Sequence, residues 1–235
     1  MDLDISLKSF QMGKNLAMVL TLEPLLHENE KDLLVGHVAM ILGKYDIAQE
    51  HYLKSSEPLN ALDMRCDIQD WFIASSLTKN IAPEQENFIS KRLAAQTESL
   101  GNNTEALKQF EKSVINGELQ TVSKAVVERH NVECFAGMAR TLIKLGDIQR
   151  GFNIAREIKD KALLGDIAVV CENMKQYLEA AQIYDKAENF EKAATLYLQL
   201  KMFKQAAPLM KKVKSKAILI KYGKAKESEG AFKEA

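Results

Sequence analysis

Three consecutive stretches of equal length carry the pattern from which the fold can be predicted: KQYLEAAQIYDKA (175–187), ENFEKAATLYLQL (188–200) and KMFKQAAPLMKKV (201–213). Each has an aromatic residue followed three positions later by Ala-Ala. Positions i, i+3 and i+7 lie on one face of an α-helix, and a small residue among them lets a neighbouring helix approach closely. We therefore expect each stretch to form one short helix and a turn, packed against the next.

The same phrase recurs along the chain as an opening aromatic or apolar residue, a small residue three positions on and a large residue seven positions on. One such unit cannot bury its own apolar face, so the units must stack, and we expect these positions to form the repeat core. The clear copies are Tyr45, Ala48, Tyr52; Tyr177, Ala180, Tyr184; Phe190, Ala193, Tyr197; and Phe203, Ala206, Met210. Two degenerate copies are Asn103, Ala106, Phe110 and Ile148, Gly151, Ala155, and Phe232 with Ala235 begins another.

Composition and punctuation extend the helical prediction to the whole chain. The sequence has only 4 prolines in 235 residues, is rich in strong helix formers, and has no Asn-Gly or Asp-Gly hairpin turn between alternating apolar runs. Gly43, Gly101 and Gly146 each follow an apolar helical stretch, as glycines at helix C-termini do. We predict an all-α chain of about 14 helices without a sheet.

The phrase resembles the tetratricopeptide repeat (TPR), whose second helix carries aromatic, alanine and aromatic in this order. That repeat has a period of about 34 residues, whereas Ala180, Ala193 and Ala206 lie 13 residues apart. Every consecutive helix therefore repeats the phrase, rather than every second one. This spacing is similar to that of coat-type and ciliary transport proteins and predicts an irregular TPR-like α-solenoid of stacked antiparallel helix pairs.

Several classes of protein are disfavoured by composition. The longest apolar runs are too short to span a bilayer, which needs about 20 residues, and no secretory signal opens the chain. Three scattered cysteines, Cys66, Cys134 and Cys171, form no CxxC motif, so we expect no disulfide framework or zinc module and a reducing compartment. Cys134 and Cys171 lie among apolar residues and should be buried.

No catalytic or cofactor-binding motif is present. Gly36 and Gly43-Lys44 lack the spacing of a phosphate-binding loop, and GxGxxG, GxSxG and HExxH motifs are missing. His37 sits in an apolar stripe and is interpreted as a core or turn-contacting side chain rather than a ligand. We predict no catalytic residue, no cofactor, no metal site and no small-molecule substrate.

Charge is unevenly distributed although the net charge is zero. Residues 1–200 hold 22 Lys and Arg against 29 Asp and Glu, whereas 201–226 has nine lysines and no acid. Such a stretch is either a solvated helix face or a contact for an acidic partner or membrane surface. We take as candidate partner contacts Lys201, Lys204, Lys211, Lys212, Lys214, Lys216 and Lys221. The acidic remainder argues against nucleic-acid binding.

A second candidate contact is acidic. Asp63, Asp67 and Asp70 are spaced i, i+4 and i+7, which places three carboxylates along one helical face, beside Trp71. They could receive basic side chains of a partner or hold a hard cation, or could be a solvated face. No nucleophile stands near them, so acid–base catalysis is unsupported.

Four longer strings carry a more specific resemblance. They are LLVGHVAMILGKYDIAQEHYLKSSEPLNALDMRCDIQDW (33–71), IAPEQENFISKRLAAQTESLGNNTEALKQFEKS (81–113), KLGDIQRGFN (144–153) and CENMKQYLEAAQIYDKA (171–187). In order and spacing they are similar to the helical region of the WD-repeat protein nineteen family, core subunits of intraflagellar transport complex A. The resemblance covers most of 30–235 and is weaker before it.

The resemblance implies a non-catalytic scaffold that binds other subunits of complex A. It implies roles in retrograde ciliary transport and entry of membrane proteins into the cilium, with localisation to the cilium or flagellum, including the basal body, and the cytoplasm. Family members carry N-terminal β-propellers. The sequence of this chain has no blocks of strand-like pattern that would predict one. We therefore expect one α-solenoid segment over 1–235, excised from a longer chain, with entry helices in 1–29 and TPR-like repeats in 30–235.

Two alternatives remain open at this point. A solenoid of a coatomer-like or clathrin-like vesicle coat protein would show the same helical pattern, and the identity of co-purifying partners would separate the two. A helical enzyme with a dispersed site is the third reading, although function must be argued from a site and none is visible in the sequence. Direct membrane contact is not supported.

Overall fold

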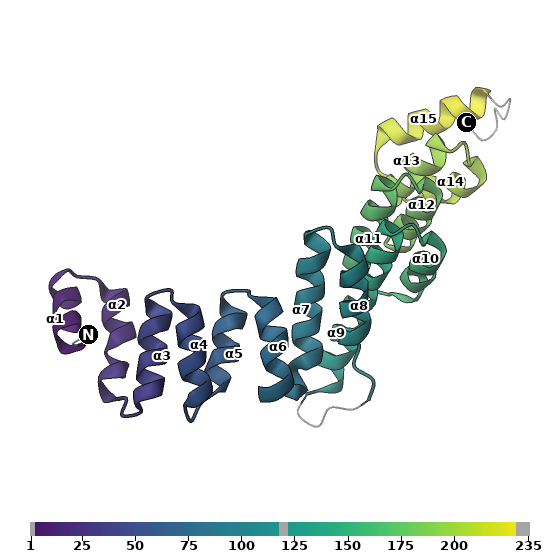
Figure 1. Cartoon of the computed structure of the whole chain (residues 1–235). Helices are drawn as coiled ribbons and strands as arrows, with labels where there is room; N and C mark the ends of the chain where they lie inside the picture. The colour runs from purple at the N-terminus through teal and green to yellow at the C-terminus, as the bar shows by residue number, and fades with distance from the viewer. Residues whose placement is uncertain (1–2, 118–121, 229–235) are drawn as a thin grey trace. The chain divides into compact units, whose positions relative to one another are not determined.

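The computed structural model describes residues 3–117 and 122–228. Contacts between Cα atoms divide the chain into two compact units, Met1–Ile89 and Ser90–Ala235, here called unit 1 and unit 2. Within each unit, most helices pack against the helix that follows them along the chain (Figure 1). Phe232, expected to open a further copy of the phrase, lies outside the described residues.

Unit 1 consists of short helices joined by tight turns and two single-turn 3₁₀ helices. Helix α3 packs against α4, and α5 packs against both α4 and α6. The bounds are α1 (Leu3–Met12), α2 (Leu16–Leu22), 3₁₀ helix Pro24–His27, α3 (Lys31–Ile41), α4 (Tyr45–Lys54), α5 (Leu59–Asp67), α6 (Trp71–Ile81) and 3₁₀ helix Pro83–Gln85.

Helix α7 (Glu86–Ser99) begins in unit 1 and ends in unit 2. Unit 2 contains the longest of the described helices, α9, and six helices that follow it along the chain. The bounds are α8 (Asn103–Ser113), α9 (Lys124–Lys144), α10 (Ile148–Glu157), α11 (Lys161–Asn173), α12 (Tyr177–Lys186), α13 (Phe190–Gln199), α14 (Phe203–Met210) and α15 (Lys216–Ser228). Helix α11 also packs against α9, and α15 packs against α13.

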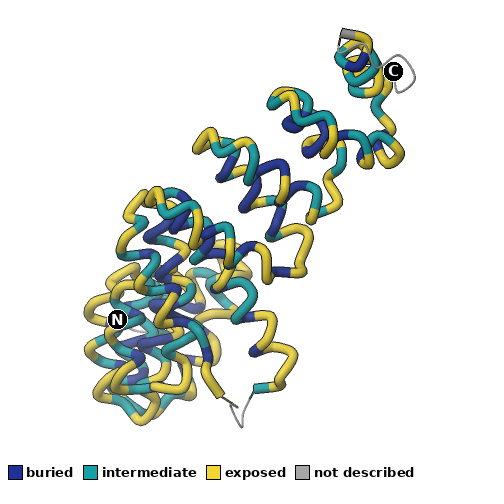
Figure 2. The backbone as a smooth tube through the Cα atoms, turned by 90° about the vertical axis from the view of Figure 1, so that its right-hand side faces the viewer, coloured by how far each residue is buried: buried dark blue, intermediate teal, exposed yellow. Residues whose placement is uncertain are grey.

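The predicted all-α solenoid is confirmed for the part of the chain that the structure describes, which has fifteen α-helices and no strand. The count exceeds the expected one because helices as short as α2, with 7 residues, are too brief to show a periodic pattern. Buried residues line the inner sides of the helix pairs and exposed residues gather at the connections (Figure 2).

One tight turn recurs between helices and sets their spacing. Its middle residue has a positive φ and donates its N–H to the carbonyl three residues back. The following residue donates its N–H to the carbonyl five residues back and caps the next helix. In the turn before α13, Glu188 has φ 59°, and the N–H of Asn189 donates to the carbonyl of Tyr184 at 2.9 Å. The residues with positive φ in equivalent turns are Lys14, Gly43, Gln69, Gly101, Gly146, Lys175 and Lys201.

These turns explain the thirteen-residue spacing. Elsewhere in unit 2 a tight turn alternates with a longer connection, but α11, α12, α13 and α14 follow one another through three tight turns in succession, at Lys175, Glu188 and Lys201. Each helix then begins at the aromatic residue of its phrase. The left-handed residue of each of these three turns is Lys or Glu rather than Gly, which is why glycine spacing marked only some of the turns.

The small residue of the phrase lies in the packed interior. Ala48, Ala106, Ala180, Ala193 and Ala206 are each 0% exposed, and Gly151 and Ala155 of the degenerate copy are buried as well. The large residue seven positions after the opening one is at most 5% exposed in Tyr52, Phe110, Tyr184 and Tyr197, and Met210 is partly buried.

The opening aromatic residue departs from the inward position expected of it. Tyr45 and Tyr177 are 37% and 38% exposed, and Phe190 and Phe203 are partly buried. Each is the first residue of its helix, directly after the turn, so only one side of the ring reaches the neighbouring helix. The sequence spacing correctly predicts the helical face on which the aromatic residue lies, but it overestimates how deeply the ring is buried.

Glycines in mid-helix receive the large aromatic side chains. A Cβ atom built at Gly36 of α3 would lie 2.6 Å from the ring of Tyr52 in α4, and one at Gly137 of α9 would overlap the ring of Phe110 in α8. The Tyr52 hydroxyl is 2.9 Å from Nδ1 of His37, so this histidine contacts the core as predicted. Both units thus use a glycine to bring an aromatic ring against a helix backbone.

Candidate interaction surfaces

The three aspartates predicted to share one helical face do not share one helix. Helix α5 ends at Asp67, because Gln69 takes a φ of 60° and turns the chain. Asp70 is the N-cap of α6, and its Oδ1 accepts a hydrogen bond from the N–H of Ile73 at 3.4 Å. Only Asp63 and Asp67 remain on the exposed surface of α5. Across 3–117 and 122–228, no group of three His, Cys, Asp or Glu side chains is placed to hold a metal ion.

Asp70 is engaged by a buried arginine that sequence patterns did not single out. Arg65 of α5 is only 4% exposed, and its guanidinium contacts Asp70 at 3.1 Å, Asp46 at 2.6 Å and Gln49 at 2.8 Å. These partners come from α4 and from the start of α6. The group therefore holds three successive helices together, and Asp70 contributes to it in addition to capping α6.

The seven candidate lysines are all exposed, but they do not form one patch. Lys201 and Lys204 lie at the turn between α13 and α14, whereas Lys211, Lys212, Lys214 and Lys216 lie at the other end of α14, in its connection to α15. Lys221 is on α15. Because α13 and α14 are antiparallel, the first two lysines and the next four occupy opposite edges of unit 2.

The four lysines at the α14–α15 connection belong to a basic edge. Lys161 at the start of α11 pairs with Glu188 at 2.6 Å, and Lys212 Nζ lies 4.4 Å from the ring centroid of Phe190. The connections α10–α11, α12–α13 and α14–α15 therefore lie along one edge of unit 2, here called the link edge: residues 156–161, 185–190 and 211–216. Lysines and arginines outnumber acids on it.

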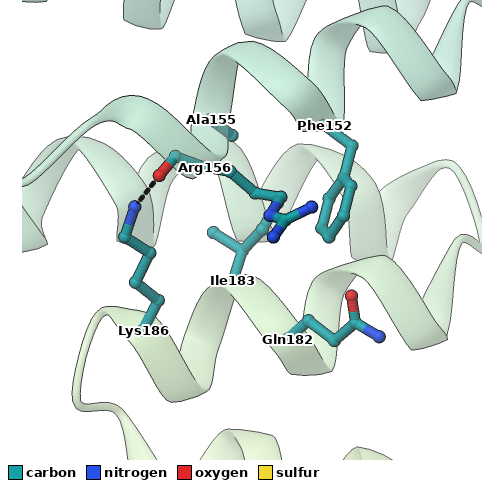
Figure 3. Close-up of a pocket in the computed structure, with 6 residues that line it drawn as sticks. All are labelled: Phe152, Ala155, Arg156, Gln182, Ile183 and Lys186. Atoms are coloured by element: carbon teal, nitrogen blue, oxygen red, sulfur yellow. Dashed lines mark hydrogen bonds between the residues drawn. The ribbon is translucent and has the colours of Figure 1, made fainter.

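A hollow of about 330 Å³ opens between α10 and α12 beside the link edge. Asp147 caps α10 by accepting from the N–H of Arg150, and the apolar face of the helix then turns Phe152 and Ala155 toward Ile183 of α12. The side chains that line the hollow are Phe152, Ala155, Arg156, Gln182, Ile183 and Lys186 (Figure 3). Lys186 donates from Nζ to the carbonyl of Arg156, which ties the ends of the two helices together.

The buried ionisable groups of unit 2 are committed to structural bonds. Glu98 of α7 accepts from Arg140 at 3.0 and 2.9 Å and from Lys144 at 2.8 Å. Burial alone would raise the pKa of this carboxyl, but the hydrogen bonds and charges of the two cations outweigh burial and lower it. Glu98 is therefore ionised within the fold and joins α7 to α9.

His130 of α9 is buried and holds the end of α8. Its Nε2 is 2.8 Å from the carbonyl oxygen of Ser113, and the side chain of neighbouring Asn131 bonds both the N–H and the carbonyl of Ile115 at 2.9 Å. Burial lowers the pKa of His130, with the bond to Ser113 opposing that shift. These contacts fix the segment that leaves α8, which is a structural role.

The two cysteines expected in the interior are there. Cys134 and Cys171 are 0% exposed, and burial raises the pKa of both thiols, that of Cys171 to about 12. Cys66 is partly exposed, and burial followed by the charges of Asp63 and Asp67 raises the pKa of its thiol. Thiols that stay protonated are poor nucleophiles. No described helix is both long enough and apolar enough to cross a bilayer.

Comparisons with known proteins agree with this architecture. WD repeat-containing protein 19 of Homo sapiens is 37% identical over 235 residues, and WD repeat-containing protein dyf-2 of Caenorhabditis elegans is 35% identical over 234 residues. Each match covers 100% of this chain, and the chain spans 17% of the length of each relative. The family resemblance read from the four sequence strings is thereby confirmed.

A solved structure, the crystal structure of BtubC from P. vanneervenii, aligns with 100% of this chain and 87% of its own, at 12% identity and a TM-score of 0.29. Similarity at this level supports no conclusion about this chain. A family model described as "Region in Clathrin and VPS" matches residues 95–231. Because that model covers more than half of the sequence, the chain belongs to the family of the helical region found in clathrin and VPS proteins.

Proposed function

We propose that this chain is a non-catalytic scaffold and protein–protein interaction segment of a subunit of intraflagellar transport complex A. The observation that carries the proposal is its 37% identity, over the whole chain, to a segment of a WD repeat-containing protein. In this role the segment supports retrograde ciliary transport and the entry of membrane proteins into the cilium. It acts in the cilium, including the basal body, and in the cytoplasm.

The disposition of polar groups supports binding rather than catalysis. Two buried charged side chains, Arg65 and Glu98, are each engaged by partners on neighbouring helices. Exposed charge includes the lysines of the α14–α15 connection, such as Lys211, Lys212 and Lys214. Stacked repeats of this kind fix their shape through the core and leave their outer residues free to define partners. The partners proposed are other subunits of complex A.

Affinity purification from ciliated cells tests the proposal. A tagged chain should recover other complex A subunits, and a triple variant Lys211→Glu, Lys212→Glu, Lys214→Glu should recover less of at least one of them. The matched control is Lys201→Glu, Lys204→Glu, which changes the same kind of charge on the opposite edge of unit 2. Equal recovery by the triple variant and the wild type would contradict the lysine contact, and recovery of no complex A subunit would contradict the scaffold role.

A vesicle-coat role is the second candidate, and the match of residues 95–231 to the clathrin and VPS region favours it specifically. Both candidates share the helical solenoid architecture. The same purification separates them, because a coat role predicts coat subunits and cargo adaptors in place of complex A subunits.

A further inference from the structure

The hollow between α10 and α12 has the composition of a recognition site for an acidic side chain. Its floor is apolar, formed by Phe152, Ala155 and Ile183, and its rim carries the Arg156 guanidinium, the Gln182 amide and the Lys186 ammonium group. Within the described residues the Arg156 guanidinium has no hydrogen-bond or ion-pair partner. We propose that this hollow binds a carboxylate side chain of an acidic, extended segment of a partner protein.

The charge that faces the hollow is of one sign. Two acids stand next to the rim in sequence, but both face elsewhere. Glu157 lines a separate hollow with Glu128 and Arg129, between α9 and α11. Asp185 is near enough to Tyr197 of α13 that its charge helps raise the pKa of that hydroxyl, after burial itself. The hollow between α10 and α12 is thus cationic without an internal counter-ion.

The chemistry of the rim fits a carboxylate. A guanidinium presents parallel N–H donors that match the two oxygens of a carboxylate, and such charge-assisted bonds are stronger than neutral ones. The Lys186 ammonium uses one donor on the carbonyl of Arg156 and keeps further donors for a ligand. The apolar floor suits the aliphatic stem of Glu or a flanking apolar residue. A volume of about 330 Å³ suits one or two side chains rather than a large ligand.

The hollow continues into the link edge, which indicates an extended partner segment. Lys186 ends α12, and the turn that follows leads to Phe190, whose ring lies 4.4 Å from Nζ of Lys212. Lys211 and Lys214 adjoin this lysine. A segment anchored at Arg156 would therefore place further acids over these three lysines. A recess with an apolar floor favours a peptide over an anionic membrane, whose headgroups present a flat surface.

This inference rests on the proposed scaffold function and names the chemistry of one partner. The probe is a short fluorescein-labelled peptide of alternating Glu-Glu and Leu residues, added to the 235-residue chain and followed by anisotropy. The neutral analogue has Gln in place of every Glu. We expect the acidic peptide to bind, the Gln analogue to bind about tenfold more weakly or worse, and Arg156→Glu to have a comparable effect.

Arg150→Glu is the matched control, because Arg150 lies on the same helix and is already paired with Asp147 at 3.3 Å. It should leave the affinity unchanged, and thermal melting of both variants should show an intact fold. In NMR spectra the Ile183 methyl signals should shift on titration, whereas those of Leu163, in the hollow between α9 and α11, should not.

Equal binding by Arg156→Glu and the wild type would overturn the inference, as would equal binding of the Gln analogue. Sedimentation of the chain with phosphatidylserine vesicles, without binding of the acidic peptide, would overturn it in favour of a membrane contact. If the hollow does not bind the acidic peptide but complex A subunits still co-purify with Arg156→Glu, the proposed scaffold function is unaffected. Failure of the scaffold function shows instead as loss of those subunits from the wild-type chain.

Discussion

Unit 1 buries Arg65 between helices and unit 2 buries Glu98, and the two charges have opposite signs. Arg65 in unit 1 is 4% exposed and has partners on α4 and at the start of α6, one of which, Asp46, is 89% exposed. Glu98 in unit 2 is 9% exposed and depends on two cations of a single helix, α9. Burying a charge costs free energy that its partners must offset, so the arrangement of partners decides how damaging the loss of one is.

The two units share their apolar packing and differ in their polar bonds. Both pack a small residue at the centre of the phrase and an aromatic ring on a glycine. The ionic groups, in contrast, join α4, α5 and α6 in one unit and α7 and α9 in the other. Substitutions at the apolar positions should therefore affect both units alike, whereas substitutions in an ionic group should affect only the unit that contains it.

The largest effect is expected from the double variant Arg140→Met, Lys144→Met. It leaves the buried carboxylate of Glu98 without a cation and should destabilise the chain by about 3–5 kcal/mol in urea unfolding. Because the two cations lower the pKa of Glu98, its contribution is present above pH 4.5 and is lost as pH falls through the lowered value. The difference in free energy of unfolding between the wild type and the variant should therefore become smaller in acid. Arg150→Met is the control, and a comparable loss there would contradict the role of burial.

A smaller effect should be common to both units. Ala193→Phe in α13 and Ala48→Phe in α4 each force a large ring into a fully buried position and should cost about 1–3 kcal/mol by overpacking. The change in melting temperature measures the loss, with the exposed Ala217→Phe as control. An unchanged melting temperature in either buried variant would break the claim that the units share one packing rule.

Within unit 1, Asp70→Ala should cost about 1–2 kcal/mol, because it removes both the cap of α6 and one partner of Arg65. Asp46→Ala should cost less, since Asp46 is largely solvated and Arg65 keeps Gln49 and Asp70. Urea unfolding of the two variants ranks them. The reverse order would show that the ion pair with Asp46 matters more than the cap.

The smallest effect concerns the turns. Lys201 has a φ of 56°, a conformation that costs free energy for any residue with a Cβ, so Lys201→Gly should stabilise the chain by about 0.5–1 kcal/mol. Gly43 in unit 1 has a φ of 70°, and Gly43→Lys should destabilise by a similar amount. Melting temperatures that move in the same direction for both variants would contradict the equivalence of the two turns.

The apolar phrase predicted the helices and their packed face because helix periodicity is a local property. It did not predict the depth of Tyr45 and Tyr177, which depends on where the helix begins. It also placed Asp70 on α5, because nothing local distinguishes Gln69 in a left-handed turn from Gln69 in a continuing helix.

The ionic groups and the hollow were beyond prediction from one sequence for a different reason. Arg65 and Glu98 look like ordinary surface charges until their helical neighbours are known, and Arg140 lies 42 residues from Glu98 along the chain. Arg156 and Lys186 are separated by 30 residues and become neighbours only through the pairing of α10 with α12. The lysine-rich stretch was visible, but its division between two edges follows from the direction of α14.

The succession of tight turns from α11 to α14 limits where the length of this chain can change. One extra residue inside α12 or α13 would rotate the following apolar positions by about 100° around the helix axis, and a turn of two or three residues has no slack to correct the rotation. The connections α10–α11 and α14–α15 adopt no such fixed bond pattern and can absorb an insertion. Related chains should therefore keep the thirteen-residue register between Lys175 and Lys201 and vary in length at the α10–α11 and α14–α15 connections.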